Sequence, residues 1–241
     1  MDKRLQTVLA HAGVVSRRRA AELIEDGKVK VDGAVVTEKG FRVDPSAHEI
    51  EVEGRVISRE EKKYYFLFNK PRGVISTVTD THSRRKVSDY FKGVTARLYP
   101  VGRLDKDTTG ILLVTNDGDL THKLSHPSFE IEKEYLAVVG PRVPERNIRR
   151  LEKGIDIEGK RTSPCKIKFV RTDPGGEVYR VVLHEGRKRQ IRMMFEAAGA
   201  RVVDLARVRY AGLTLGSLKP GEHRPLTAEE VSKLKKAKRG A

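Results

Sequence analysis

The sequence predicts an α+β protein in two parts, a small N-terminal domain over residues 1–60 and a larger domain over residues 64–235. Three observations support this prediction. Helical spacing and then a hairpin signal occur near the start of the chain. Short apolar runs separated by turns rich in Gly and Pro, typical of strands, fill the later part. A charged segment, residues 58–63, separates the two parts, and residues 236–241 form a basic tail.

The first predicted helix is marked by an apolar face. Leu5, Val8, Leu9 and Ala12 recur at helical spacing, and Gly13 ends the helix. A second helix follows, with Ser16 as its N-cap and its end near Gly27. Three arginines, Arg17, Arg18 and Arg19, lie in the first turn of that helix. Because the helix dipole disfavours cations there, we expect an anion nearby.

A hairpin follows the two helices. Val29–Val31 and Ala34–Val36 flank the pair Asp32–Gly33, which is a strong signal for a two-residue hairpin loop. In the larger domain the apolar runs predict six strands and the amphipathic runs predict four helices. The predicted strands are residues 64–68, 74–78 (after a sharp turn at 69–73), 111–115, 134–139, 163–171 and 178–183. The predicted helices are 118–125, 144–153, 188–198 and 227–237.

Composition narrows the class of function. The 241 residues carry a formal net charge of +16. Residues 1–62 hold twelve basic and twelve acidic residues, so the excess lies in residues 63–241. Such a charge indicates a polyanionic partner, most simply a nucleic acid, with an anionic membrane surface as the alternative. No apolar segment reaches membrane-spanning length and no signal-peptide core follows Met1, so we expect a cytoplasmic protein without membrane contact.

The sequence offers no metal or cofactor motif. The single Cys165 excludes a disulfide framework and any site with several cysteines. His122 and His126 have the spacing of one helix face, but no Glu stands between them as in the zinc proteases, so surface or packing roles are favoured. Phosphate-binding glycine motifs are also missing. We therefore expect neither a metal nor a cofactor.

The segment Gly102–Gly110 holds the most informative carboxylate of the chain. Asp105 and Asp107 lie in a turn that runs into the apolar residues Ile111–Val114. A carboxylate so close to a core is costly to ionise unless something compensates its charge. It is therefore a candidate functional group, although an ordinary surface turn has the same composition.

Two other chemistries match this turn only in part. Asp105-x-Asp107-x-Thr109 follows the pattern of aspartyl phosphatases, but there the strand precedes the nucleophile, whereas here the apolar run follows it. The same residues open like a calcium-binding EF-hand loop, which needs a bidentate Glu at its twelfth position. That position is Asn116. Neither alternative fits.

Four ordered motifs resemble the pseudouridine synthases of the RsuA/RluB type. They are Lys70-Pro71-x-Gly73, Gly102-Arg103-Leu104-Asp105-x-x-Thr108-x-Gly110, Lys133-Glu134-Tyr135 and Gly186-Arg187-x-Arg189-Gln190-Ile191-Arg192. The N-terminal part, from Arg4-Leu5 to Asp32-Gly33, resembles the α-L RNA-binding fold shared with a small-subunit ribosomal protein. Asn116-Asp117-Gly118-Asp119, His126-Pro127 and Phe195-Glu196-Ala197-x-Gly199 are most similar to the RluB branch, which modifies large-subunit (23S) ribosomal RNA.

The resemblance implies a catalytic domain built on a mixed, mostly antiparallel sheet with flanking helices, and it implies roles for five residues. Asp105 is the catalytic carboxylate, which attacks ribose C1′ or removes a proton from C2′; the sequence does not choose between these routes. Arg192 supplies a cation paired with Asp105, and Tyr135 stacks on the base and moves the C5 proton. Ile191 forms a wall of the base pocket, and Arg103 fills the space of the flipped nucleotide.

The resemblance further implies RNA contacts for a set of basic side chains, mostly to the phosphate backbone. They are Arg4, Arg17, Arg18, Arg19, Lys28, Lys30, Lys70, Arg72, Arg187, Lys188 and Arg189. Two other functions stay open, a synthase acting on 16S ribosomal RNA and a non-catalytic RNA binder in ribosome assembly. The modified uridine, and whether the substrate is free ribosomal RNA or an assembly intermediate, are not encoded in one sequence. We expect a monomer, since no exposed heptad suggests self-association.

Overall fold

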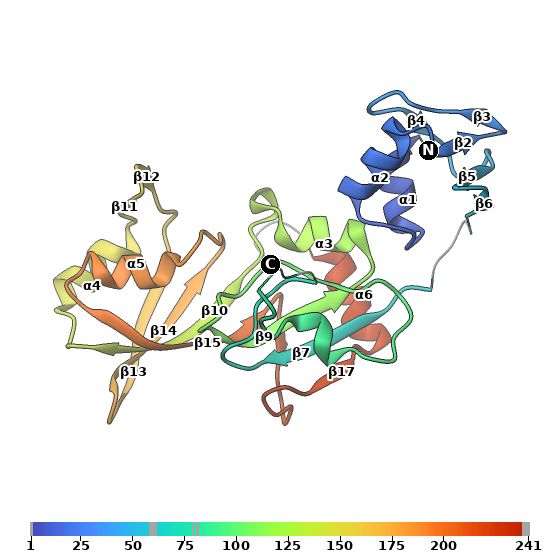
Figure 1. Ribbon diagram of the computed structural model, residues 1–241. Helices are drawn as coiled ribbons and strands as arrows, with labels where there is room; N and C mark the ends of the chain where they lie inside the picture. The colour runs from blue at the N-terminus through green and yellow to red at the C-terminus, as the bar shows by residue number, and fades with distance from the viewer. Residues whose placement is uncertain (1, 58–61, 79, 81, 238–241) are drawn as a thin grey trace. The chain divides into compact units, whose positions relative to one another are not determined.

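The chain folds into two compact units in a computed structural model that describes residues 2–57, 62–78, 80 and 82–237 (Figure 1). The first unit covers residues 1–64 with residues 94–97 and 116–118, and the second covers the remainder. Within the described ranges, no helix is both long and apolar enough to span a membrane.

The first unit combines two helices with short strands, as the sequence predicts. The hydroxyl of Ser16 accepts a hydrogen bond from the Arg19 N–H at 3.1 Å and so caps the second helix. Asp32 and Gly33 have φ of 49° and 79°, the backbone that a two-residue hairpin needs. The elements are β1 (Lys3–Arg4), α1 (Leu5–His11), α2 (Arg17–Glu25), β2 (Val29–Val31), β3 (Ala34–Val35), β4 (Arg42–Val43), β5 (Ile50–Val52) and β6 (Arg55–Val56).

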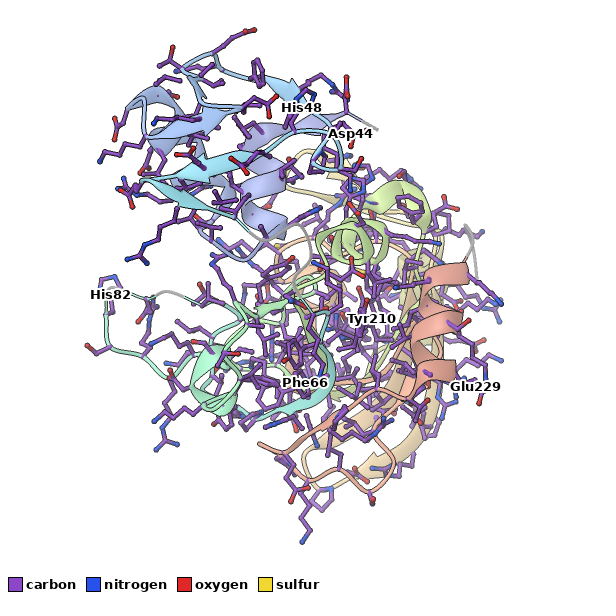
Figure 2. The ribbon with its side chains drawn as sticks, turned by 90° about the vertical axis from the view of Figure 1, so that its right-hand side faces the viewer. Asp44, His48, Phe66, His82, Tyr210 and Glu229 are labelled. Atoms are coloured by element: carbon purple, nitrogen blue, oxygen red, sulfur yellow. The ribbon has the colours of Figure 1, made fainter. Side chains whose placement is uncertain are left out.

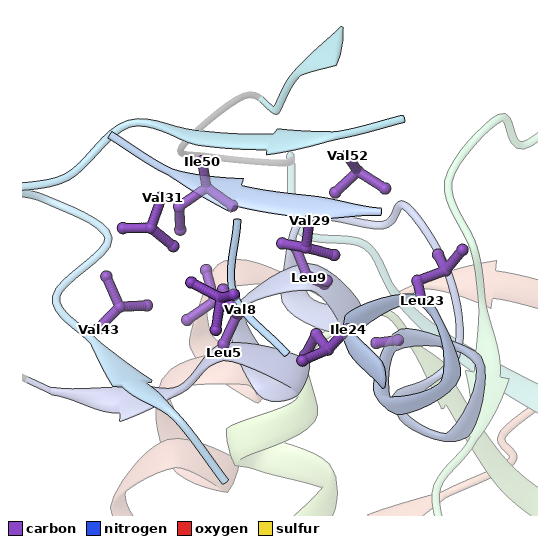
Figure 3. Packing of buried hydrophobic residues seen from close by; sticks show 12 residues of the cluster. Leu5, Val8, Leu9, Leu23, Ile24, Val29, Val31, Val43, Ile50 and Val52 are labelled. Carbon is purple, nitrogen blue, oxygen red and sulfur yellow. The ribbon is translucent and has the colours of Figure 1, made fainter. Parts of the chain in front are cut away.

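This unit has a hydrophobic core of its own. Leu9 from α1 and Leu23 from α2 point toward Val29 of β2 and Val52 of β5 (Figure 3). These side chains are almost completely buried. Burial of one such side chain contributes roughly 1.5–3 kcal/mol, so a dozen of them can stabilise a domain of about 60 residues.

The second unit is built on a nine-stranded sheet, counted over the described residues, with the order β13-β14-β10-β15-β9-β7-β17 (Figure 1). Two short strands, β8 and β16, pair at its sides with β9 and β15. Every pairing is antiparallel except that of β15 with β9, which confirms the predicted mixed, mostly antiparallel sheet. The strands are β7 (Tyr65–Lys70), β8 (Tyr99–Pro100), β9 (Thr109–Thr115), β10 (Lys133–Gly140), β13 (Lys166–Asp173), β14 (Gly176–Leu183), β15 (Arg201–Tyr210), β16 (Leu213–Thr214) and β17 (His223–Pro225).

Helices cover this sheet at both ends. Leu124 of α3 and Leu234 of α6 pack with Leu67 of β7 and with Ile111 of β9, whereas α4 and α5 lie along the other end of the sheet (Figure 1). Figure 2 shows Tyr210 in the interior of the unit and Glu229 pointing outward from α6. The helices are η1 (Val87–Tyr90), α3 (Gly118–Ser125), η2 (Pro127–Phe129), α4 (Glu145–Glu152), α5 (Gln190–Glu196) and α6 (Ala228–Lys236), and a hairpin β11 (Asp156–Ile157)–β12 (Lys160–Arg161) joins α4 to β13.

Two sequence expectations about strands were wrong. Residues 74–78 do not form a strand; only Ile75 makes a bridge, to Lys86. The strand predicted over 64–68 continues to Lys70, because Asn69 and Lys70 still pair with Ile111 and Gly110. The basic tail over 236–241 stays a prediction: Lys236 is the last residue of α6, and residues 238–241 lie outside the described residues.

Strand β15 was missed because two bulges disturb its alternation. Val203 and Val208 are extra residues opposite β10, at the register shifts between Val138 and Val139 and between Glu134 and Tyr135. A regular strand places residues three apart on opposite faces, but a bulge between them restores a common face. Arg207 and Tyr210 are therefore both buried although their spacing is odd.

Candidate active site

A pocket of about 330 Å³ opens in the second unit. The turn that carries Asp105 contributes one side, the start of β10 and the end of β15 contribute the floor, and the loop between β14 and α5 contributes the rim. The residues that line it include Arg103, Asp105, Lys133, Tyr135, Glu185, Arg187, Lys188, Arg189, Ile191, Arg207 and Tyr210. Catalytic, base-pocket and RNA-binding candidates from separate motifs therefore meet at one cavity.

Asp105 begins a tight turn directly before β9. The Thr108 N–H donates to the Asp105 carbonyl at 3.0 Å. Asp105 is half-buried, whereas Lys106 and Asp107 are exposed. The turn thus aims one carboxylate at the pocket and leaves the other on the surface. The apolar strand follows the turn, which is the order that argued against a phosphatase.

Lys70 stabilises this turn through hydrogen bonds to its main-chain carbonyls. Its ammonium donates to the carbonyls of Pro71 (3.2 Å), Asp105 (3.1 Å), Lys106 (3.3 Å) and Thr108 (2.8 Å), and the residue is completely buried. Burial lowers the pKa of Lys70 to about 8, while the carboxylates of Asp105 and Asp107 act in the opposite direction. The expected contact of Lys70 with the RNA backbone is wrong, because a side chain enclosed by four carbonyls cannot reach a phosphate.

Ser76 fixes the residue before Asp105. Its hydroxyl donates to the Leu104 carbonyl at 2.7 Å and accepts from the Leu104 N–H at 3.0 Å. The end of β7 and the loop after it therefore hold both ends of the Asp105 segment, because Lys70 binds its carbonyls and Ser76 binds Leu104. Asp105 owes its position to contacts from residues about thirty positions earlier in the chain.

A glycine allows the close approach of the two central strands. Gly110 in β9 pairs with Arg207 in the parallel β15 and has φ of 99°. A Cβ atom at this position would lie 2.2 Å from the Arg207 carbonyl oxygen. Only glycine fits both the backbone angle and the space.

Tyr135 and Ile191 lie where the base pocket was predicted. Tyr135 is in β10 between Val181 of β14 and Arg207 of β15, and only 9% of its surface is exposed. Ile191 is buried in the first turn of α5. Both line the cavity with Asp105, so the pocket offers an aromatic ring and an aliphatic side chain to a flat base.

Polar contacts order the rim loop between β14 and α5. The Gln190 side chain accepts from the Arg187 N–H at 3.1 Å and donates to Glu185 at 2.6 Å. The Arg187 guanidinium donates to the carbonyls of Lys160 (2.6 Å) and Arg161, so it ties the β11–β12 hairpin to the rim. Arg187 is therefore engaged within the protein, although it lines the pocket, while Lys188 and Arg189 are exposed beside it.

Arg192 lies behind the pocket rather than in its lining. It is buried, and its Nη1 donates to the Val202 carbonyl at 2.8 Å, while its Nε has no hydrogen-bond partner among the described residues. Burial is the main cause that lowers its pKa, with Arg189 next, and Asp105 and Asp107 act in the opposite direction. The expected ion pair is not formed within 4.0 Å: of the ion pairs among described residues, none joins Arg192 to Asp105.

The remaining predicted RNA contacts are exposed. Arg103 and Arg72 belong to the second unit, and Arg72 forms an ion pair with Asp204 at 2.5 Å. In the first unit Arg19 pairs with Glu22, Lys28 with Asp26 and Glu53, and Lys30 with Glu51. The exposed basic residues of that unit are Arg4, Arg17, Arg18, Arg19, Lys28 and Lys30.

Two pocket residues, Lys133 and Arg207, were not predicted as site residues. Lys133 was quoted only as part of a motif, and Arg207 lies in the strand that was missed. Nothing in the sequence singles out Arg207, because the segment Val202–Tyr210 also contains Asp204 and a second arginine, Arg209. No group of three or more His, Cys, Asp or Glu side chains suited to a metal ion occurs in the described part of the chain.

Comparison with known proteins identifies the two units. A family model for RNA pseudouridylate synthase matches residues 64–197, and a model for the S4 domain matches residues 3–48. The first match covers more than half of the chain and contains every pocket residue except those of β15.

The chain belongs to the RNA pseudouridylate synthase family.

Relatives of this pseudouridine synthase extend over almost its entire length. A Bacillus subtilis protein named ribosomal large subunit pseudouridine synthase B is 49% identical over 97% of this chain and 96% of its own. An RNA pseudouridine synthase of Aquifex aeolicus is 36% identical, with 98% of this chain and 95% of the relative covered. A solved pseudouridylate synthase structure superposes with a TM-score of 0.68 at 31% identity, over 96% of this chain and 99% of that one. The enzyme class expected from the sequence is confirmed.

Proposed function

We propose that this enzyme converts a specific uridine of 23S ribosomal RNA to pseudouridine, with Asp105 as the catalytic carboxylate. The observation that carries the proposal is the pocket itself, where Asp105, Tyr135 and Ile191 meet although they come from three separate motifs. The large-subunit assignment rests on the Bacillus subtilis relative, whose name states that substrate and whose sequence is 49% identical. A monomer that acts in the cytoplasm is part of the same proposal.

The reaction exchanges one bond for another. The uracil N1–C1′ bond breaks, the base turns, and C5 joins C1′, while the proton of C5 leaves and N1 gains a proton. Asp105 serves either route to the first step. Its carboxylate oxygen bonds to C1′, or it takes the C2′ proton as a C1′=C2′ double bond forms. Both routes need a carboxylate that reaches the ribose, and the position of half-buried Asp105 in the pocket lining supports this role.

Arg192 and Tyr135 assist Asp105 in this proposal. The buried guanidinium of Arg192 lies near enough to Asp105 to sense its charge, and its Nε has no other partner among described residues. Substrate entry brings the pair together, since catalytic contacts often tighten only in the complex. Tyr135 stacks on the uracil and moves the C5 proton, and Ile191 closes the opposite wall.

The target nucleotide reaches the pocket only after leaving its stack, at a cost of a few kcal/mol. Arg103 is exposed at the mouth, where its planar guanidinium can occupy the vacated position. Arg72, Lys188 and Arg189 lie on the surface of the same unit and hold phosphates. The S4 domain adds Arg4, Arg17, Arg18, Arg19, Lys28 and Lys30, whose contacts position the RNA without reading its sequence.

The decisive experiment compares Asp105→Asn with Asp107→Asn. Ribosomal RNA is mapped for pseudouridine in a deletion strain that carries the wild-type chain or either variant, and RNA affinity is measured with the purified proteins. We expect Asp105→Asn to abolish one pseudouridine in 23S ribosomal RNA with RNA affinity changed less than twofold. Asp107→Asn, which alters the exposed carboxylate of the same turn, keeps the modification.

Other results would redirect the assignment. A missing pseudouridine in 16S ribosomal RNA identifies the small subunit as the substrate. If the deletion strain lacks no pseudouridine in either RNA, the chain acts as an RNA-binding assembly factor and the proposal fails. Arg192→Met supplies a second check, because the pairing of Arg192 with Asp105 predicts loss of the chemical step with little effect on RNA affinity.

A further inference from the structure

Two cations share the floor of the pocket. Lys133 opens strand β10 and Arg207 lies in β15, and both line the cavity beside Tyr135. Tyr135 pairs with Arg207, and Lys133 pairs with Tyr210, across the bulge at Val208. The bulge brings Arg207 and Tyr210 to the same side of the sheet, where both line the cavity.

Neither cation forms an ion pair within 4.0 Å among the described residues. Arg207 is only 2% exposed, its Nε donates to the Ile111 carbonyl at 2.8 Å, and its Nη2 has no hydrogen-bond partner among described residues. The guanidinium lies over the Tyr210 ring, 4.5 Å from the centroid. Lys133 donates to the carbonyls of Ile131 (2.7 Å) and His184 (3.5 Å), and no ion pair of Lys133 occurs among described residues.

Buried cations without carboxylate partners are costly. Burial lowers the pKa of Lys133 to about 8, and the Arg207 guanidinium lowers it further, while Glu185 acts in the opposite direction. Arg207 is buried and Lys133 is half-buried, and both line the same cavity, so an anion bound there would compensate their charge. The pocket is walled by Tyr135 and Ile191, which suit a flat ring better than a phosphate.

We propose that Lys133 and Arg207 stabilise the negative charge that develops on the uracil ring when its N1–C1′ bond breaks. This inference rests on the proposed reaction. By either route of Asp105 the electron pair of the broken bond passes to N1 and spreads over O2 and O4. The base stays an anion until C5 joins C1′, so a fixed positive charge beneath the ring lowers the energy of bond breaking and keeps the free base in place.

The test compares the leaving base in two substrates. The single-turnover rate of N1–C1′ bond breaking, followed as loss of the starting nucleoside, is measured on an RNA fragment that the wild-type enzyme modifies, with uridine or 5-fluorouridine at the target. This step is common to both substrates, whereas loss of the C5 proton is possible only with uridine. Fluorine withdraws electrons and stabilises the base anion without help from the protein. The variants are Lys133→Met, which removes the charge at nearly constant length, and Lys168→Met, a matched control at an exposed lysine of β13.

We expect Lys133→Met to lower the rate on uridine roughly 100-fold, as for the loss of one donor to a developing anion. The loss should be at least threefold smaller on 5-fluorouridine, the RNA dissociation constant should change less than twofold, and Lys168→Met should match the wild type. An equal loss on both substrates identifies a merely structural role and overturns the proposal. A loss in RNA affinity with an unchanged rate identifies a phosphate site and overturns it as well.

Lys133→Arg keeps the test decisive if the methionine variant folds poorly. In the wild type the single-turnover rate should fall as pH rises through about 8, because Lys133 then loses its charge. The groups that face it are Arg207 and Tyr210 of β15, Glu185 and His184 of the rim loop, and Asp105. Lys70 loses its charge over the same pH range. Lys133→Arg should therefore make the decline shallower, because one titrating group remains instead of two, and a decline of unchanged steepness contradicts the proposal. Failure of the large-subunit assignment would appear differently, as modification of another RNA by the wild-type enzyme.

Discussion

The Lys70 ammonium donates to the main-chain carbonyl of Asp105 at 3.1 Å, so a buried cation touches the backbone of the proposed catalytic residue but not its carboxylate. The same ammonium reaches the Thr108 carbonyl at 2.8 Å, across the turn. Lys70 thereby fixes the two ends of the turn at once and brings a positive charge under the carboxylates of Asp105 and Asp107.

Lys70→Met should weaken both the fold and the reaction. Removing the donor leaves buried carbonyl groups without a partner, which lowers the free energy of unfolding by about 2–3 kcal/mol. The turn then no longer holds Asp105, so the modification rate should fall even at temperatures where the variant is fully folded. Urea unfolding and single-turnover kinetics measure the two effects. Lys168→Met serves as the control, and a variant as stable as this control would contradict the role given to Lys70.

Gly110→Ala should be among the most damaging small substitutions. The new Cβ would lie 2.2 Å from the Arg207 carbonyl oxygen at a φ of 99°. Gly212→Ala is the matched control, because Gly212 has φ of 79° with no atom within 4 Å of an added Cβ. We expect a loss of about 1 kcal/mol for Gly212→Ala and at least about 3 kcal/mol for Gly110→Ala. Thermal unfolding measures both, and equal losses would show that strands β9 and β15 can separate without cost.

The ion pair between Arg224 and Glu230 should make the free energy of unfolding depend on pH in the acid range. Arg224 holds the pKa of Glu230 well below its ordinary value of 4.5, at about 2. Because the folded pKa is the lower one, the contribution is complete above pH 4.5 and is lost as pH falls through about 2. Glu230→Gln should therefore cost about 1–2 kcal/mol at pH 7, reduced by solvent around Arg224, and little near pH 2. Glu229→Gln, at an exposed pair with Lys233, should be neutral in the same urea titrations.

Cys165 should be unreactive in the folded protein. Burial is the main cause that raises the pKa of its thiol to about 12, so almost no thiolate is present at pH 8. Iodoacetamide should therefore modify the native chain slowly and the urea-unfolded chain at the rate of an ordinary cysteine, as followed by mass spectrometry. Fast labelling of the native protein would show that the segment around Cys165 opens.

The sequence predicted those parts of the site that depend on local order. Asp105 could be found because a polar turn stands directly before the buried strand β9, and Ser16 because N-caps act on their own helix. The burial of Lys70 could not be predicted from the sequence, because its four hydrogen-bond acceptors include carbonyls 35 to 38 residues away. A lysine next to proline and glycine has the composition of an exposed turn, and only the pairing of β7 with β9 encloses it.

The burial of Arg207 could not be predicted either, because it also depends on residues distant in the sequence. Its strand carries charged residues and two bulges, so neither an apolar run nor regular alternation marks it. Its burial becomes visible only when β10 and β9 lie on either side. The expected pair of Arg192 with Asp105 depended on the family resemblance, and the structure brings the two into electrostatic range without a direct ion pair.

The hydrogen bond from Arg207 to the Ile111 carbonyl joins residues 96 positions apart. Because of this separation, the catalytic pocket can form only after most of the chain has been synthesised. All buried members of the S4-domain core lie between Leu5 and Val52. That domain can be complete while the ribosome is still making the catalytic domain, whereas the pocket waits for β15 to emerge and insert between β9 and β10. During synthesis the S4 domain can therefore fold well before the catalytic pocket is complete.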